Sequence, residues 1–206
     1  IESKSLLAAT EYAFVSRRAG YTKSLNAFNV AKKLRVVDTP GYGQFGEYEH
    51  GSAVIEYIQR RETLRTVFLL IDSVKGFQQD DLEVLDLLVQ RGVSFDVVLT
   101  KVDEVYRKKV PKGMEFDPAK CTSDTKKQEN LQLSIEANRA IIKHFDRLVK
   151  DSDIQNAPMS PRIFFTNSIG SKVLPKRYGN ADIRAAIMQS CGLFQENKAD
   201  GIEYTD

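Results

Sequence analysis

Cysteine and histidine are scarce in this chain of 206 residues, which contains two of each. Cys121 and Cys191 form no CxxC pair and have no metal-ligand spacing, so neither a disulfide framework nor a zinc site is predicted. His50 and His144 also lie far apart in the sequence, and they predict no ligand pair or catalytic base. A reducing compartment is therefore the default expectation.

Long hydrophobic runs and a strong excess of one charge are missing as well. No apolar stretch approaches the ~20 residues of a membrane-spanning helix and no signal peptide is visible, so we expect no membrane insertion. Lys and Arg number 30 against 28 Asp and Glu, and this formal charge of +2 is too small to predict a nucleic-acid partner by itself. The chain opens on Ile1, which leaves open whether further sequence, including a targeting segment, precedes it.

What the chain does have is an alternation of strand-like and helix-like segments. Two strand-like segments, 24–30 and 33–38, are separated by two residues and predict an antiparallel pair. After them, apolar runs of strand length alternate with amphipathic segments, which predicts a mostly parallel sheet with helices on both faces. The expected strands are 66–72, 95–100 and 162–167, and the expected helices are 51–64, 80–90, 131–149 and 181–190.

The apolar residues at helical spacing predict which face of each helix is buried. In helix 51–64 the residues expected to face inward are Val54, Ile55, Ile58 and Leu64. In helix 80–90 they are Leu82, Leu85, Leu88 and Val89, and in helix 131–149 they are Leu131, Ile135, Ile142, Phe145 and Val149. A long polar stretch, 111–130, interrupts the alternation and is predicted to be a loop or insertion.

Unusual polar residues stand where the predicted strands end, and ligands of such sheets bind outside the carboxyl ends of the strands. The segment "VVDTPGYGQ", 36–44, places Asp38 at a strand end, where an acid can orient a water molecule on Mg²⁺. Gly41 has no side chain, so its amide can approach a terminal phosphate oxygen closely. This segment therefore predicts a site that contacts phosphate and metal.

A second polar segment, "TKVD", follows the predicted strand 95–100. Asp103 can accept two hydrogen bonds from the edge of a guanine, while the aliphatic stem of Lys101 packs beside the base. Asn167 and Ser168 end the next predicted strand. Together with the phosphate segment, this pattern favours GTP over ATP as the ligand.

The motifs "DTPGYG" and "TKVD" resemble those of the TRAFAC GTPases. With "AGYTKSLNAFNV" and "LLIDSVKGFQQDDLEVLDLL" beside them, the chain is most similar to the EngB/YihA family of ribosome-assembly GTPases, over about residues 4–190. The resemblance implies an α/β fold, a P-loop NTPase G domain with a mostly parallel sheet, one antiparallel edge strand and helices on both faces. This domain is expected over 1–190, with a polar insertion at about 104–130 and a tail over 191–206.

The resemblance also implies a role for each matching residue. Thr22 corresponds to the switch-one threonine that reaches Mg²⁺ and the terminal phosphate, and Lys4 and Ser5 correspond to the end of the phosphate loop. The implied phosphate and switch residues are Lys4, Ser5, Thr22, Asp38 and Gly41, and the implied Mg²⁺ ligands are Ser5, Thr22 and Asp38. The implied guanine-base residues are Thr100, Lys101, Asp103, Asn167 and Ser168.

The sequence departs from the family pattern in two places. It lacks the phosphate loop GxxxxGK[ST], and its start, "IESKSLLAAT", has Ser3 where the family has glycine. The family's first strand is absent too, and because a sheet without its middle strand is not expected to be stable, a truncated or gapped sequence is favoured over a true loss. Tyr42 stands where Ras-like enzymes carry a water-orienting glutamine, so slow turnover is expected until a partner or a monovalent cation assists.

The function implied by this resemblance is a slow GTPase that uses GTP or GDP with Mg²⁺ and acts as a switch in assembly of the large ribosomal subunit. Its partners would be that subunit or its precursor, with rRNA and ribosomal proteins, and the protein itself is expected to be a monomer. The basic cluster Arg60, Arg61 and Arg65 either contacts rRNA or is a solvated helix end. The insertion and tail exceed the compact bacterial pattern, which favours the mitochondrial matrix over the cytoplasm. A nucleotide-binding scaffold and a pseudo-GTPase interaction module, both without significant hydrolysis, are the alternatives.

Overall fold

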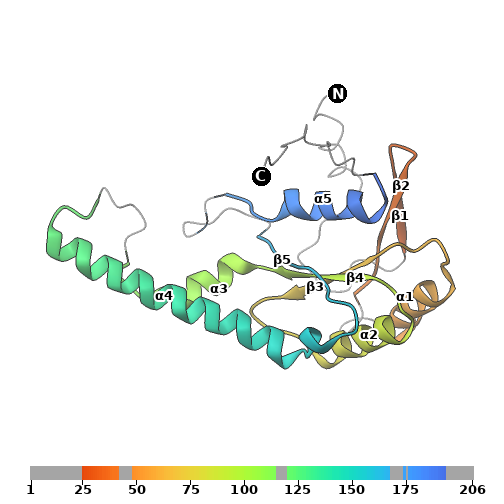
Figure 1. Ribbon diagram of the computed structural model, residues 1–206, viewed down its shortest axis with the longest axis horizontal. Coiled ribbons are helices and arrows are strands. Elements are labelled where there is room, and N and C mark those ends of the chain that lie inside the picture. The colour runs from red at the N-terminus through yellow and green to blue at the C-terminus, as the bar shows by residue number, and fades with distance from the viewer. Residues whose placement is uncertain (1–24, 42–47, 115–119, 168–173, 175, 194–206) are drawn as a thin grey trace, which may run out of the picture. The chain divides into compact units, whose positions relative to one another are not determined.

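The chain divides into two compact units, residues 1–61 and 62–206. The computed structural model describes residues 25–41, 48–114, 120–167, 174 and 176–193 (Figure 1). The first unit therefore contributes a hairpin and a helix to the description, and the second unit contributes the parallel sheet with its helices.

The hairpin of the first unit consists of β1 (Asn26–Val30) and β2 (Leu34–Asp38), which pair antiparallel. The turn between them is closed by a 3.0 Å hydrogen bond from the Lys33 amide to the Val30 carbonyl, and Ala31 and Lys32 adopt the positive φ values typical of type I′ turns. The predicted antiparallel pair is thus confirmed, and Asp38 is the last residue of β2.

Helix α1 (Tyr48–Arg60) completes the described part of the first unit. Val54 and Ile58, one helical turn apart, are buried, as the apolar spacing predicts. The prediction was wrong for Ile55, which is exposed, and for Leu64, which lies beyond the end of the helix. The helix also begins before the predicted start at 51.

The second unit is built on three parallel strands in the order β3 (Val67–Asp72), β4 (Phe95–Thr100) and β5 (Ile163–Phe165). All residues of the central strand from Phe95 to Leu99 are buried, so this strand is covered on both faces, as expected of a continuous apolar run in a parallel sheet. The predicted α/β fold with parallel strands and an antiparallel pair is confirmed, although among the described residues the antiparallel pair β1–β2 forms a sheet of its own and is not an edge of the parallel sheet.

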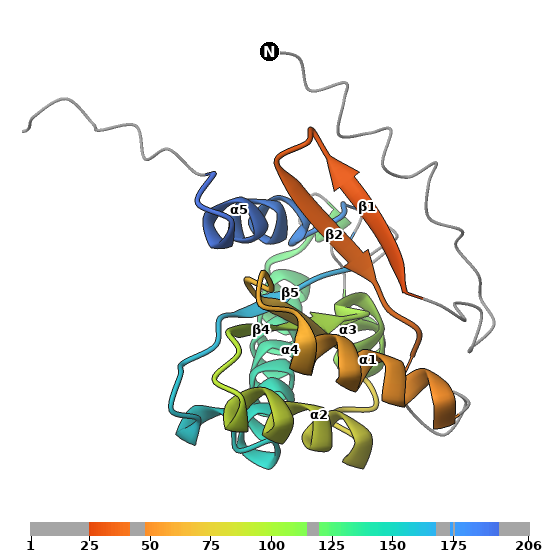
Figure 2. The ribbon, with the colours of Figure 1, turned by 90° about the vertical axis from the view of Figure 1, so that its right-hand side faces the viewer.

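Four helices pack around this sheet: α2 (Gln79–Gln90), α3 (Val102–Lys109), α4 (Asp124–Asp151) and α5 (Asn180–Ser190), with a short 3₁₀ turn at Ile154–Asn156. Figures 1 and 2 show α2 and α4 on one face of the sheet and α5 on the other, so the prediction of helices on both faces is confirmed. No helix within the described ranges is long and apolar enough to cross a membrane.

Helix α4 begins at Asp124, inside the stretch 111–130 that the sequence predicts to be a loop, so that prediction was wrong for the end of the stretch. Ser123 caps the helix, because its hydroxyl accepts a hydrogen bond from the Lys126 amide at 3.3 Å. The residues that follow are polar but are mostly good helix formers, so the helix starts here without an apolar face to reveal it.

The buried face of α4 also differs from the predicted one. Ala137, Ile141 and Leu148 are buried, whereas the side chains predicted to face inward include Leu131 and Ile142, which are 62% and 68% exposed. The buried stripe is rotated by about a quarter of a turn from the apolar stripe, because α4 packs against α3 and the 3₁₀ turn. Its amino-terminal half also extends beyond the sheet (Figure 1).

Helix α2 follows its prediction more closely. Leu85 and Leu88 are buried as expected, together with Val84, while Leu82 and Val89 are only half-buried. The Asp81 carboxylate accepts a 2.8 Å hydrogen bond from the Gln78 amide, which satisfies a donor at the start of the helix. The helix therefore begins where its acidic first turn predicts.

An ion pair between the buried Asp96 and the partly exposed Arg162 holds the amino end of the sheet together. Asp96 on β4 accepts hydrogen bonds from the Arg162 amide and Nε, both at 3.0 Å, and from Nη2 at 2.7 Å. The other guanidinium nitrogen, Nη1, donates to Gln189 at the end of α5 at 2.7 Å. The hydrogen bond to Asp96 raises the pKa of Arg162 above its usual value. This arrangement links β4, the entry to β5 and the end of α5.

We expect Asp96→Ala to lower the free energy of unfolding by about 3 kcal/mol, because it leaves the Arg162 guanidinium without its buried partner. Urea unfolding followed by circular dichroism measures the loss. Asp146→Ala is the matched control, since it removes an exposed pair with Lys150 on α4 that is 2.8 Å long, and it should cost less than about 0.5 kcal/mol. Equal losses in the two variants would contradict this assignment of the Asp96 pair.

Candidate nucleotide-binding site

The carboxyl ends of β3, β4 and β5 lie at one edge of the sheet, where the sequence predicts the base site. Asp72 and Thr100 are register partners at the ends of β3 and β4. Beyond β5, the Thr166 amide donates to Leu99 at 2.9 Å and the Thr166 carbonyl accepts from the Val102 amide at 3.2 Å. These backbone bonds extend the sheet by one step and fix the loops that carry the predicted residues.

Thr100 joins the ends of β3 and β4 at this edge. Its hydroxyl donates to the Ile71 carbonyl at 3.1 Å, and its own carbonyl accepts from the Ser73 amide at 3.0 Å. The Thr100 side chain therefore holds the exits of β3 and β4 together. The threonine of "TKVD" therefore has a structural role in joining the two strands.

Lys101 makes the turn from strand to helix. Its backbone is left-handed, with φ 57° and ψ 35°, and α3 begins at the next residue. This abrupt turn places Asp103 in the first turn of α3, half-buried and close in sequence to the end of β4. The fold therefore brings Thr100, Lys101 and Asp103 to a single corner of the sheet edge.

Asp72 joins this corner, although the sequence analysis did not select it as a site residue. Its carboxylate oxygen Oδ2 lies 2.7 Å from Lys101 Nζ, and Oδ1 accepts hydrogen bonds from the amides of Val74 at 2.9 Å and Lys75 at 3.3 Å. A signal for it was present, because Asp72 ends the otherwise apolar strand "VFLLID" just as Asp38 ends its own strand. An acidic residue at the end of a strand is therefore a signal that marks both Asp38 and Asp72.

The contact shifts the titration of both partners. Burial acts to raise the pKa of Asp72, but the hydrogen bonds from Lys101, Val74 and Lys75 and the lysine charge outweigh it, so the pKa lies below its usual value. The hydrogen bond to Asp72 raises the pKa of Lys101 above its usual value, against an opposing effect of burial. Because the pKa of Asp72 is lowered in the folded protein, its contribution to stability is lost as the pH falls through that pKa. Because the pKa of Lys101 is raised, its contribution is lost as the pH rises through the folded pKa of the lysine. Both groups are therefore charged at neutral pH.

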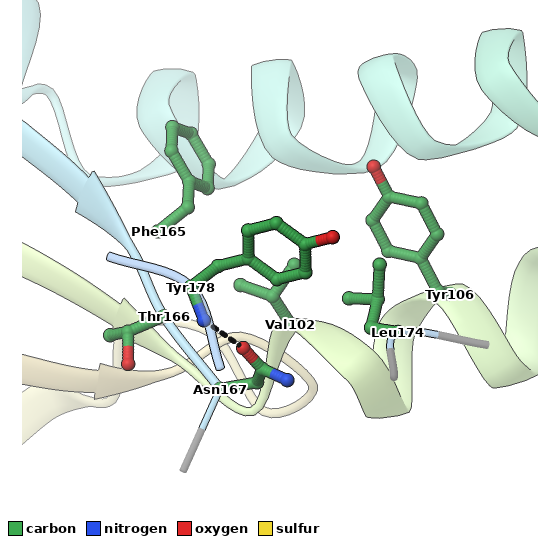
Figure 3. A pocket seen from close by; sticks show the side chains of 7 residues that line it. All are labelled: Val102, Tyr106, Phe165, Thr166, Asn167, Leu174 and Tyr178. Atoms are coloured by element: carbon green, nitrogen blue, oxygen red, sulfur yellow. Dashed lines mark hydrogen bonds between the residues drawn. The ribbon is translucent and has the colours of Figure 1, made fainter. Parts of the chain in front are cut away.

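Asn167 lies at the end of the next strand and is 1% exposed. Its amide nitrogen donates to the Lys176 carbonyl at 2.9 Å, and its amide oxygen accepts from the Tyr178 amide at 2.7 Å (Figure 3). Asn167 thus anchors the segment that leads into α5. Its predicted contact with a base stays a prediction, as does that of Ser168, which lies outside the described residues.

An open pocket of about 320 Å³ adjoins Asn167 on the α3 side. Val102, the residue between Lys101 and Asp103, lies on its wall, and the rings of Tyr106 and Tyr178 flank it (Figure 3). The complete lining is Val102, Tyr106, Phe165, Thr166, Asn167, Leu174 and Tyr178. The lining is mainly apolar, and the two charged residues of "TKVD" are not part of it.

His144 on α4 supports the exit of β3. Its Nε2 lies 2.7 Å from the carbonyl oxygen of Ser73, the residue after Asp72. The His144 side chain is half-buried, and this hydrogen bond links α4 to the loop after β3.

The predicted phosphate and metal residues belong to the first unit. Asp38 is exposed at the end of β2, where its carboxylate offers the oxygen ligand that Mg²⁺ prefers. A Cβ at Gly41 would have no described atom within 4 Å, so the space beside its backbone is open to a ligand. In the ranges that the structure describes, three or more acidic, cysteine or histidine residues never gather in one metal-binding cluster. Lys4, Ser5, Thr22 and Tyr42 lie outside those ranges, and their roles stay predictions.

A parallel sheet with "TKVD" at the turn from strand to helix is typical of guanine-nucleotide-binding α/β proteins. The family described as 50S ribosome-binding GTPase matches residues 4–101. Among curated proteins, "Probable GTP-binding protein EngB" of Wolbachia pipientis is 31% identical over 155 residues, covering 70% of this chain and 76% of the relative. The chain therefore belongs to the EngB family of GTP-binding proteins.

Two further relatives match the chain over different lengths. "MIOREX complex component 8" of Saccharomyces cerevisiae is 33% identical over 179 residues, which is 87% of this chain and 46% of that protein. "Probable GTP-binding protein EngB" of Rickettsia rickettsii is 40% identical over 96 residues, which is 44% of this chain and 45% of that protein. The chain thus spans about half the length of these two relatives.

Gly179, the residue before α5, lies close to the backbone at the end of β5, and this contact gives a prediction. Its φ is +81°, and an added Cβ would clash with the Phe165 carbonyl and lie 3.2 Å from Thr166 Cβ. Gly192 has a φ of +67° but open space around it, so it controls for backbone strain alone. Gly192→Ala should cost about 1–2 kcal/mol of unfolding free energy, and Gly179→Ala a further ~1–3 kcal/mol from the clash. Equal midpoints in urea would contradict the close packing.

Proposed function

We propose that this protein is a guanine-nucleotide switch that hydrolyses GTP slowly by itself and acts in assembly of the large ribosomal subunit. The observation that carries the proposal is the corner formed by Thr100, Lys101 and Asp103 at the carboxyl edge of the sheet, beside the loop anchored by Asn167. Membership in a family of GTP-binding proteins supports the same ligand.

Guanine recognition is assigned to Asp103 and Lys101. A carboxylate accepts two hydrogen bonds, from N1–H and from the exocyclic amine of guanine, whereas adenine presents no such pair of donors. The lysine stem supplies an apolar surface beside the ring, and its ammonium group stays at the sheet edge. The two side chains together select guanine over adenine.

The phosphates and Mg²⁺ are assigned to the first unit. Asp38, with Ser5 and Thr22, would hold the metal, and Mg²⁺ would neutralise charge that develops on the phosphate oxygens. The open space beside the Gly41 backbone leaves room for a terminal phosphate. Lys4 would provide a positive charge to the same group.

The slow rate is assigned to Tyr42, because a phenol does not orient an attacking water as a carboxamide does. A ribosomal particle, or a monovalent cation near the phosphates, would supply what is missing. The name of the matched family includes ribosome binding, which supports the large subunit as partner. The proposed location is the mitochondrial matrix. The yeast relative, which matches 87% of this chain, supports the eukaryotic origin that this location requires.

Replacing Asp103 with asparagine tests the base site. Asparagine accepts one hydrogen bond and donates another, which suits the carbonyl of xanthine where guanine has its amine. We expect the affinity of the full-length protein for GDP to fall by about a hundredfold, while its affinity for xanthosine diphosphate rises above that of the wild type. Isothermal titration with each nucleotide measures both. Weakened binding of both nucleotides alike would contradict the role of Asp103.

Assays of the full-length wild-type protein distinguish the GTPase switch from a nucleotide-binding scaffold and from an interaction module. GTP turnover that rises when large ribosomal subunits are added supports the switch. GDP affinity without turnover, with or without subunits, would indicate a nucleotide-binding scaffold. If the full-length protein binds no guanine nucleotide, the proposed function is wrong and the interaction module takes its place.

The basic cluster gives a prediction about the partner. Arg60, Arg61 and Arg65 are exposed, and Arg60 is 3.0 Å from Glu56. Changing the three arginines to glutamine should weaken binding to large subunits and lower the slope of log affinity against log salt by about one per arginine. GDP affinity should not change. The control makes the same change at Arg139, Lys143 and Arg147 on α4, and equal losses of subunit binding in both triple variants would contradict a specific contact.

A further inference from the structure

Lys101, the residue expected to cover a base, is restrained little by the backbone around it. It stands at a left-handed turn between β4 and α3, outside the regular backbone of either element, and its side chain is 52% exposed. A lysine has four rotatable side-chain bonds, so an unrestrained stem would have to be ordered each time that a base binds.

Asp72, by contrast, is held from several directions. Its side chain is 20% exposed, its backbone lies in register with Thr100, and its Oδ1 accepts hydrogen bonds from the Val74 and Lys75 amides. The residue after it is secured by His144. These contacts fix the carboxylate and leave Oδ2 directed at Lys101 Nζ, 2.7 Å away.

We propose that Asp72 is a positioning residue of the base site: it holds the ammonium group of Lys101 so that the lysine stem lies ready along the sheet edge before the base arrives. This inference rests on the proposed function, since it assumes that Lys101 packs beside guanine. It adds a residue from a different strand, 29 positions earlier in the chain, that has no contact with the base itself.

The aliphatic stem of Lys101 connects the ends of two strands. One end is fixed at the β4–α3 turn and the other at the end of β3, so the methylene groups between them run from β4 to β3 at the edge of the sheet. Because the ordering of the side chain is accomplished in the free protein, it does not have to be repeated on binding, and the affinity for the base rises. The pair is charged on both sides at neutral pH, as its opposed pKa shifts indicate.

A double-mutant cycle in the full-length protein tests the inference with Asp72→Asn, Lys101→Ala and the double variant. Asparagine retains a side-chain oxygen for the Val74 and Lys75 amides but loses the charge that holds the ammonium group. We expect Asp72→Asn to weaken GDP binding by about three- to tenfold. Pyrophosphate, which has no base, should compete with a fluorescent GDP analogue at unchanged affinity. In the Lys101→Ala background, Asp72→Asn should have no further effect on GDP.

The control variant is Asp146→Asn, which makes the same chemical change in the exposed Asp146–Lys150 pair on α4. It should leave the affinities for GDP and pyrophosphate unchanged. A second readout follows the lysine directly: the rate of Lys101 acetylation in the nucleotide-free protein, measured by mass spectrometry, should rise in Asp72→Asn and not in Asp146→Asn.

Two results would overturn the inference. One is an equal loss of GDP and pyrophosphate affinity in Asp72→Asn, and the other is an undiminished effect of Asp72→Asn in the Lys101→Ala background, because either would place the action of Asp72 on its loop and not on the lysine. Unchanged GDP affinity in Asp72→Asn would overturn it too, while the guanine site itself would stand. Failure of the wild-type protein to bind GDP would instead refute the proposed function, and the acetylation rate would still decide whether Asp72 restrains Lys101.

Discussion

The parallel pairing of β3 with β4 is the constraint on which the candidate site depends. The two strands run in register from Val67 and Phe95 to Asp72 and Thr100. Because they end together, the residues that follow them emerge side by side at one edge, and Thr100 closes the contact through its hydroxyl. A slip of one residue would direct every side chain to the opposite face and separate Asp72 from Lys101.

The two ends of the sheet are stabilised in different ways, and the difference matches their roles. At the amino end, Asp96 and Arg162 form a multiply bonded, partly buried pair that links three elements. At the carboxyl end, the described residues are joined by backbone hydrogen bonds, by side-chain hydrogen bonds of Thr100, His144 and Asn167, and by the half-exposed pair of Asp72 with Lys101. This pair leaves polar groups accessible at the edge. A rigid base thus supports an edge that can receive a ligand, as is general for open α/β sheets.

Much of the fold could be predicted from two kinds of local pattern: the apolar run of the central strand, which is buried on both faces, and the two strand-like segments that are close enough in sequence to pair as a hairpin. The segment "FDVVLT" is a strand over the predicted residues, and the predicted strands 24–30, 33–38 and 66–72 were correct to within two residues at each end. Helix α4 was predicted less well, because its first turns have no apolar periodicity and its buried face depends on which neighbours it meets. Apolar residues such as Ile142 remain exposed, which periodicity alone does not reveal.

The sequence by itself determined which functional groups the candidate site contains, since "DTPG" and "TKVD" carry them at fixed spacing and each begins with the last residue of a predicted strand. Only the tertiary structure decided which groups act on one another. Asp72 and Lys101 are 29 residues apart, and Asn167 receives its partners from the segment before α5. Such pairs form because strand register and helix packing bring distant residues within hydrogen-bond distance, and local sequence contains no record of that distance.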